Sequence, residues 1–354
     1  TEGQLEVVDN TVTAAAAEGI WFYPVGPEAE ITVTGNNIHE ADGKQGIKFE
    51  NKPASINSKT NEVDMLIAIK ADNDNATVML SWIKTVGSTG EDYTTIHEAV
   101  NEANDGDAIL VKEGTYTADN TKPIIINRRV TLIGDNATIE VSTGNQPIQV
   151  KANGTIIYGF TITKTDKSHQ DIIYINANNV KIMNNIITGQ YELGNDQVDR
   201  AILGVSGKTG IQIVGNTINN LRQPAYFNGG NTGNVEDNYV TNTRGWVVGG
   251  DSNMLFTGNE FGTNAVDIAI IPNNNTINNY GTTPQEIIAI SESNNGAYVE
   301  NQLSKISAKD GELYKTVSLM SGETEEYYYK IQEAINSAEE GDTILVAPGT
   351  YEAE

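Results

Sequence analysis

The sequence predicts an all-β fold, a solenoid of stacked parallel coils that is repeated as tandem modules. Three observations predict it. A segment that begins at Ile96 recurs at Ile331, short Ile- and Val-rich stretches alternate with Gly, Asn and Asp every 21 to 31 residues, and helical periodicity is nearly absent. Long-period repetition with short, regularly spaced strands is typical of solenoids, in which each unit contacts only its neighbours.

The long repeat has a period of roughly 235 residues. A shift of 235 residues places Ile96 on Ile331, and 14 of the 24 residue pairs from that point are identical. Residues 7–13 (VVDNTVT) resemble residues 235–241 (VEDNYVT), and residues 66–69 (LIAI) resemble residues 287–290 (IIAI). The chain is therefore expected to hold the tail of one repeat, one complete repeat and the head of a third.

This repeat predicts the domain organisation. The expected segments are the C-terminal coils of a preceding repeat at 1–70, a linker at 71–92, a complete repeat at 93–290, a linker or small β element at 291–327, and the cap helix and first strand of the next repeat at 328–354.

A shorter period inside the complete repeat predicts a ladder of asparagines. The stretches IMNNII, IVGNTI, VEDNYV and FTGNEF align four of them, Asn185, Asn216, Asn238 and Asn259. An apolar residue follows each one by two positions, as expected if the asparagines stack at a turn and the apolar residues fill the lumen. The alternative is a set of unrelated turn asparagines.

A short amphipathic helix is predicted at 96–104, because Ile96, Ala99, Val100 and Ala103 fall at helical spacing before the strand AILV. Such a helix would cap the open end of a solenoid. The stretches AVNEANDGDAILVKEGTY and AINSAEEGDTILVAPGTY resemble the opening segment of right-handed parallel β-helix proteins of the pectate lyase-like superfamily. That superfamily includes pectin methylesterases and many repetitive prokaryotic surface proteins. The resemblance implies the fold, since this motif marks architecture and not activity.

Composition narrows the function classes. The net charge of −25 disfavours binding to nucleic acid or anionic lipid, and the absence of cysteine excludes disulfides and thiol chemistry. No apolar run approaches the roughly 20 residues that span a bilayer.

A column of charged residues at one turn is the candidate for chemistry. Its members are Asp171, Asp199, Arg200, Gln223 and Arg244, with His169, Arg222 and Asp267 nearby in the same pattern. The resemblance implies that two Asp, an Arg and a Gln could form a methylesterase site, or that Arg and carboxylates could form a lyase site. The competing interpretation is a ladder of alternating charges, in which oppositely charged side chains of stacked turns pair with one another and have no role in chemistry. Because the other motifs of those enzymes are missing, no catalytic residue is expected.

Two further kinds of site are considered. Tyr226 and Trp246 could stack on sugar rings, or they could pack in the core or at an edge. No cofactor is expected. The acidic loops at 72–75 and 192–196 could bind calcium through oxygen ligands, although neither has the spacing of a known calcium loop, and solvated turns explain both.

The sequence favours a structural role without catalysis. The expected protein is an extracellular or cell-surface protein of a prokaryote, such as a surface layer, filament or adhesin stalk. Its partners would be copies of itself or adjacent repeats of the same chain, and possible further ligands are cell-wall or host polysaccharides. The alternative is a lyase or esterase acting on polysaccharide, or a carbohydrate-binding adhesin, that uses the charged column.

Overall fold

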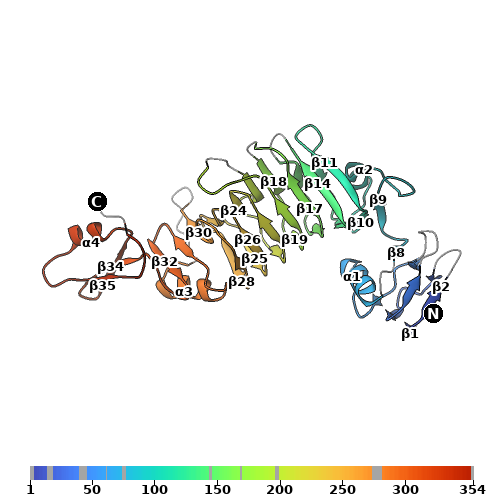
Figure 1. Ribbon diagram of the computed structural model, residues 1–354, viewed down its shortest axis with the longest axis horizontal. Helices are drawn as coiled ribbons and strands as arrows, with labels where there is room; N and C mark the ends of the chain where they lie inside the picture. Colours follow the sequence, from blue (N-terminus) through green and yellow to red (C-terminus); the bar gives the residue numbers. More distant parts are fainter. Residues whose placement is uncertain are drawn as a thin grey trace.

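The protein is an elongated chain of stacked β coils. The structure is a computed structural model that describes residues 4–13, 19–39, 46–60, 62–73, 77–142, 146–167, 170–195, 199–272 and 281–351. A long central solenoid separates a smaller N-terminal unit from a small C-terminal β unit (Figure 1). The predicted fold class is confirmed, because both coiled units are built from parallel sheets with few helices.

The central solenoid has three sheets. The first contains β9 (Lys84–Val86), β10 (Ala108–Val111), β13 (Thr131–Gly134), β16 (Ile156–Tyr158), β19 (Lys181–Met183), β22 (Ile211–Val214), β25 (Thr232–Glu236) and β28 (Asn253–Thr257). The second contains β11 (Gly114–Ala118), β14 (Ala137–Val141), β17 (Thr161–Lys164), β20 (Ile186–Thr188), β23 (Thr217–Asn219), β26 (Tyr239–Thr241) and β29 (Glu260–Phe261). The third runs through β12 (Ile124–Ile126), β15 (Ile148–Val150), β18 (Gln170–Ile175), β21 (Asp199–Gly204), β24 (Gln223–Asn228), β27 (Trp246–Gly249) and β30 (Ile268–Ile271).

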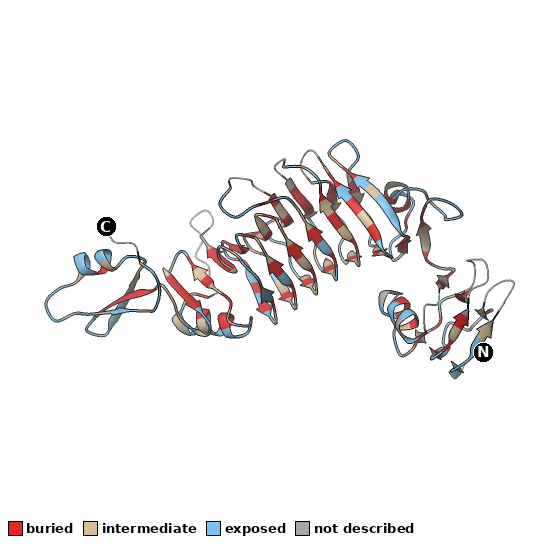
Figure 2. Cartoon of the chain, viewed as in Figure 1, coloured by how far each residue is buried: buried red, intermediate tan, exposed pale blue. Residues whose placement is uncertain are grey.

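Parallel pairing in register builds the core. Each strand of a sheet comes from a successive coil, so equivalent residues stack about 4.8 Å apart and side chains of one kind form rows. In the second sheet Ile187 pairs with Ile218, which pairs with Val240, and all three are fully buried. Buried residues recur on the successive strands of the solenoid (Figure 2). The apolar rows thus fill the lumen along the whole axis.

The four predicted asparagines stack at the corner between the first and second sheets, where all four are buried. Asn216 shows the pattern. Its Oδ1 accepts hydrogen bonds from the backbone N (2.9 Å) and the Nδ2 (3.1 Å) of Asn185. Its own Nδ2 donates to Asn238 Oδ1 at 3.0 Å and to the Ile182 carbonyl at 2.9 Å. Each side-chain amide therefore makes hydrogen bonds with the backbone and the ladder asparagines of the adjacent coils, so these buried polar groups have partners.

The residue before each ladder asparagine has a left-handed backbone, with φ of 54° at Asn184, 67° at Gly215, 54° at Asp237 and 69° at Gly258. Only Gly, Asn and Asp adopt this conformation readily. Their order along the column also matters, because a Cβ on Gly215 would lie 2.2 Å from Asn184 Oδ1, and one on Gly258 would lie 2.2 Å from Asp237 Oδ1. Glycine and a small polar residue therefore alternate.

Helices close both ends of the solenoid. At its start, α2 (Ile96–Asn101) buries Ile96, Ala99 and Val100 over the lumen, and the Thr95 side chain caps it. At its end, α3 (Pro284–Glu292) begins with a capping box between Thr283 and Glu286. The predicted cap at 96–104 thus corresponds to a shorter helix, and the IIAI stretch at 287–290 lies in a helix and not in a coil.

The N-terminal unit repeats the plan of the solenoid's end on a smaller scale. Its sheets are β1 (Gln4–Val8), β4 (Glu30–Thr34) and β7 (Ser55–Ile56); β2 (Thr11–Thr13) and β5 (Asn37–His39); and β3 (Ile20–Phe22), β6 (Gly46–Phe49) and β8 (Thr77–Leu80), with α1 (Glu62–Asp72) as its helix. After α1, Asn73 Oδ1 accepts from Asn36 Nδ2 at 2.8 Å. After α3, Asn294 Oδ1 accepts from Asn259 Nδ2 at 2.7 Å. Each unit therefore ends in a helix followed by a terminal ladder asparagine, which the sequence reasoning missed.

The N-terminal unit packs against the outer face of the solenoid's first sheet. Ala108, Leu110 and Ile133 are buried there in one apolar cluster with α1 residues, among them Leu66. Lys70 of α1 also contacts Asp135 across the junction, with Nζ 2.6 Å from Oδ1. Residues 71–92, expected to be a linker, contain β8 and β9, which are strands of the two units.

The C-terminal part extends the third sheet and then forms a separate small sheet. β31 (Val299–Asn301) continues the parallel sheet, and β32 (Ile306–Lys309) and β33 (Glu312–Leu313) add antiparallel strands. The small sheet holds β34 (Val317–Ser321), β35 (Thr324–Tyr328) and β36 (Thr343–Val346), next to α4 (Ile331–Ser337). β36 is the second copy of β10, yet it pairs antiparallel with β34.

The Asn216→Ala variant tests the ladder. We expect it to lower the free energy of unfolding by about 3 kcal/mol, because it leaves buried donors and acceptors of the adjacent coils without partners. Denaturant unfolding followed by circular dichroism measures the change. Asn253→Ala, at an exposed position of β28, is the control and should change stability by less than about 0.5 kcal/mol. Equal effects of the two variants would contradict a stabilising ladder.

Candidate functional site

Three of the predicted charged-column residues lie side by side on the third sheet. Asp171 of β18 pairs with Arg200 of β21, and Arg200 pairs with Gln223 of β24. The strands are parallel and in register, so residues from three successive coils form one row across the sheet. We call Asp171, Arg200, Gln223 and the neighbouring Tyr226 the arginine row.

Arg200 is held from three sides. Its Nη1 donates to Asp171 Oδ1 at 2.9 Å, and its Nε donates to Gln223 Oε1 at 3.0 Å. The guanidinium carbon lies 4.8 Å from the centre of the Tyr226 ring, within the range of a cation–π contact. Asp171 is only 4% exposed, so its side-chain oxygens need hydrogen-bonding or charged neighbours in place of water. The row is thus a connected network of a guanidinium, a carboxyl group, an amide and an aromatic ring.

The second predicted carboxylate belongs to a different cluster. Asp199 precedes Arg200 and faces the interior, because successive residues of a strand point to opposite faces. Its Oδ1 lies 3.7 Å from Nζ of Lys164, and both side chains are fully buried. Lys164, at the end of β17, also donates to Asp166 Oδ1 at 3.0 Å. The sequence reasoning missed Lys164; its signal was a lysine at an inward position of the strand TITK.

Among the described residues, the other members of the predicted column have contacts outside the arginine row. Arg244 is exposed, and its backbone N donates to the Arg222 carbonyl at 2.7 Å. His169 lies outside the described residues. The predicted column is therefore brought together only in part, as Asp171, Arg200 and Gln223.

The two aromatic candidates have different environments. Tyr226 is half-buried in the arginine row, whereas Trp246 is fully buried and packs edge to face against Phe256, with ring centres 6.0 Å apart. Trp246 is thus a core residue and is not accessible to a sugar. Trp21 resembles it in sequence but is 52% exposed on β3. A shift of one residue in a strand exchanges the two faces, which explains the difference.

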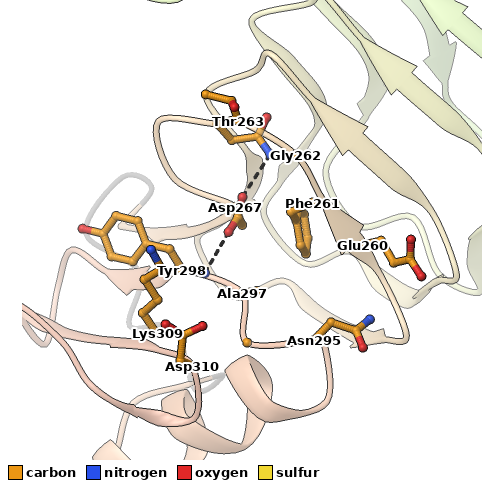
Figure 3. A pocket seen from close by; sticks show the side chains of 12 residues that line it. Glu260, Phe261, Gly262, Thr263, Asp267, Asn295, Ala297, Tyr298, Lys309 and Asp310 are labelled. Carbon is orange, nitrogen blue, oxygen red and sulfur yellow. Dashed lines mark hydrogen bonds between the residues drawn. The ribbon is translucent and has the colours of Figure 1, made fainter.

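A groove of about 670 Å³ lies where the solenoid meets the C-terminal strands. Phe261, Asp267, Tyr298 and Lys309 are among its lining residues (Figure 3). Asp267 accepts hydrogen bonds from the backbone N of Tyr298 at 2.8 Å and from Asn264 Nδ2 at 3.0 Å. Burial raises the pKa of its carboxyl, and these two hydrogen bonds oppose the rise. Asp267, at the end of the solenoid, thus accepts a hydrogen bond from Tyr298, the residue just before β31. This bond links the last coil to the C-terminal strands.

In the part of the chain that the structure describes, no three or more His, Asp or Glu side chains lie together in a way that could hold an ion. In the first of the two acidic loops, Asn73 ends the asparagine ladder and Asp72 Oδ2 accepts from Asn57 Nδ2 at 2.9 Å. Residues 74, 75 and 196 of the two loops lie outside the described ranges.

The comparisons with known proteins agree with the fold. A family model described as a protein of unknown function (DUF1565) matches residues 83–149, which span the start of the solenoid from β9 to β15. This family has a right-handed β-helix fold of the pectate lyase-like type, as predicted from the opening segment. No curated protein and no solved structure matched the chain. Within the described ranges, no helix is long and apolar enough to cross a membrane.

A double-mutant cycle tests whether the arginine row stabilises the solenoid. We expect Arg200→Met to cost about 1–3 kcal/mol of unfolding free energy, because Asp171 loses the guanidinium that faces it. In an Asp171→Asn background the same change should cost about 1 kcal/mol less. Denaturant unfolding of the four proteins gives the coupling energy. The exposed Arg244 provides the control, Arg244→Met, which should be nearly neutral. If the unfolding free energies lost in Arg200→Met and Asp171→Asn simply add in the double variant, the two residues are not coupled and the prediction is wrong.

Proposed function

We propose that the protein is a structural, non-catalytic component of a prokaryotic cell surface or extracellular assembly, built as a rod of tandem β-helix units. The observation that carries the proposal is the junction between the N-terminal unit and the solenoid. Both units end in a helix and a ladder asparagine, and α1 shares an apolar core with Leu110 and Ile133 of the next unit. Successive units are therefore joined by packed side chains, and not by a flexible linker.

Such a junction suits a load-bearing role. A solenoid pairs the backbone groups of each coil along its axis, and a buried apolar interface resists bending between units. The acidic surface keeps separate rods apart at low salt, and assembly would then depend on specific contacts. The partners we propose are copies of the protein or adjacent repeats, in a surface layer, filament or adhesin stalk.

Electron microscopy tests the proposal, with calcium and after chelation. We expect straight rods that associate into ordered filaments or lattices. Leu110→Lys should place a charge in the junction and let the N-terminal unit swing relative to the solenoid. Leu255→Lys is the matched control, because Leu255 is 55% exposed on β28 of the same sheet, and its rods should stay straight.

Two outcomes would contradict the proposal. One is dispersed particles at all salt and calcium concentrations. The other is an N-terminal unit that already moves freely in the unmutated protein.

The arginine row supports a second candidate, the binding or processing of acidic polysaccharide. A guanidinium fixed beside an aromatic ring offers a partner to the carboxylate of a uronic acid and a surface for its ring. Whether such a site also cleaves or de-esterifies the sugar depends on Asp171, the carboxylate of the arginine row, because Asp199 faces the interior.

Polygalacturonate tests this candidate, with binding followed by calorimetry and turnover by release of products. Binding through the arginine row should become about tenfold weaker in Arg200→Met, a loss of about 1.4 kcal/mol, and should be unchanged in Arg244→Met. Absence of both binding and turnover in the unmutated protein would remove the candidate.

A further inference from the structure

A fully buried lysine and a fully buried aspartate face each other in the middle of the solenoid, and the proposed function uses neither. Lys164 is the last residue of β17, and Asp199 is the first residue of β21, one coil further along the axis. Both side chains are 0% exposed, and Lys164 Nζ lies 3.7 Å from Asp199 Oδ1. Lys164 pairs in register with Val141, which is fully buried. The lysine therefore occupies a position of the lumen that the preceding coil fills with an apolar residue.

Stability alone does not account for this pair. Burying two ions costs desolvation energy, and well-packed apolar residues of similar volume are often at least as stable. A charge-assisted N–H···O bond is about 2.7–2.9 Å long, so the separation of 3.7 Å is longer than the bond that best compensates this cost. Transfer of one proton from Nζ to the carboxylate would remove both charges from the core. The two groups are then an amine and a carboxylic acid, which are the reactants of amide formation.

A second carboxyl group contacts the same amine. Lys164 Nζ donates to Asp166 Oδ1 at 3.0 Å and also to the Asp166 backbone carbonyl. The Asp166 side chain is 29% exposed, so its carboxyl group can exchange protons with water. A general acid or base must lie within about 2.6–3.2 Å of the proton-bearing atom, and Asp166 meets this requirement. Nζ is thus held between one buried carboxyl group and one that can accept its proton.

We propose that Lys164 and Asp199 condense to form an intramolecular amide bond between their side chains. Lys164 Nζ attacks the side-chain carboxyl carbon of Asp199, so that a C–N bond forms and the C–O bond to the hydroxyl group breaks. Asp166 takes a proton from Nζ and gives one to the hydroxyl group, which leaves as water. The fold holds the two reactants together, and no oxidant, reductant or cofactor is consumed.

The bond would connect consecutive coils of the solenoid. It would join the second sheet to the third across residues that are 199 − 164 = 35 apart in the sequence. Such a closed loop restricts the unfolded chain. β21 also follows the connection in which the ladder step is 31 residues, against 22 and 21 for the next two steps. The bond would therefore fix the strand at which this longer connection rejoins the coil. This inference goes beyond the proposed function and does not rest on it.

Mass spectrometry of the intact, unmutated chain tests the proposal. We expect the denatured chain to be about 18 Da lighter than its sequence, because one water is lost. Trypsin does not cleave after an acylated lysine, so the digest should contain a branched peptide that joins residues 152–167 to residues 182–200. Lys164→Met, which has a side chain of similar length but no amine, is the matched control and should have its full mass. The unmutated chain decides the question even where this variant does not fold.

Asp166→Asn tests the proton transfer separately. It leaves both reactants in place, so the amide should still form, but at least about tenfold more slowly when the mass is followed in samples taken soon after synthesis. An unchanged rate would overturn the role of Asp166.

Two results would overturn the amide bond itself. One is the full mass in the folded, unmutated chain, which would leave Lys164 and Asp199 as a buried ion pair. The other is a loss of water without the branched peptide, as a cyclic imide at another aspartate would give. Either result leaves the structural function to be decided by microscopy.

Discussion

In-register stacking of parallel coils is the constraint from which the other features of this protein follow. A strand that pairs with its equivalents above and below must repeat its inward residues, its corners and its hydrogen-bonding side chains at each level. The asparagine ladder is the clearest result, because a buried amide at one level is satisfied only by an amide at the next. The left-handed residue before it, and the alternation of glycine with Asn or Asp there, follow from the same spacing.

Stacking also leaves unpaired strand edges on the first and last coils of a unit, so each unit needs an element that covers its end. The protein ends both units in the same way, with a helix over the lumen and an asparagine that completes the ladder. The helix of the first unit has a second contact, since α1 also covers the outer face of the next unit's first sheet. Termination and attachment therefore use one element, which relates the fold to the proposed role as a stiff array.

Much of the fold can be predicted from the sequence because periodic features leave periodic patterns. The asparagine register, the lumen row of Ile187, Ile218 and Val240, and the capping segment at Ile96 were all readable. Features that depend on a single register step were harder to predict. Trp21 and Trp246 look equivalent in sequence, but Trp21 is exposed and Trp246 is buried. LIAI and IIAI fall in segments expected to form coils, yet they lie in α1 and α3. The arginine row could be anticipated as a column, but Asp199 precedes Arg200 in the same strand and therefore faces the interior. Its partner there, Lys164, comes from β17, which the strand pattern alone does not connect to the column.

The asparagine corner also determines where the protein can vary. Two residues form that corner, and a longer turn there would break the contact between adjacent amides. Yet the ladder spacing is 31 residues between Asn185 and Asn216 but 22 and 21 for the next two steps. Most of the additional residues of the 31-residue step lie in sequence between β20 and β21, the connection from the second sheet to the third, and not at the corner that holds the ladder. Insertions in that connection therefore leave the stacking of the coils unchanged. The surface formed by such connections can diversify in sequence, whereas the asparagine corner cannot.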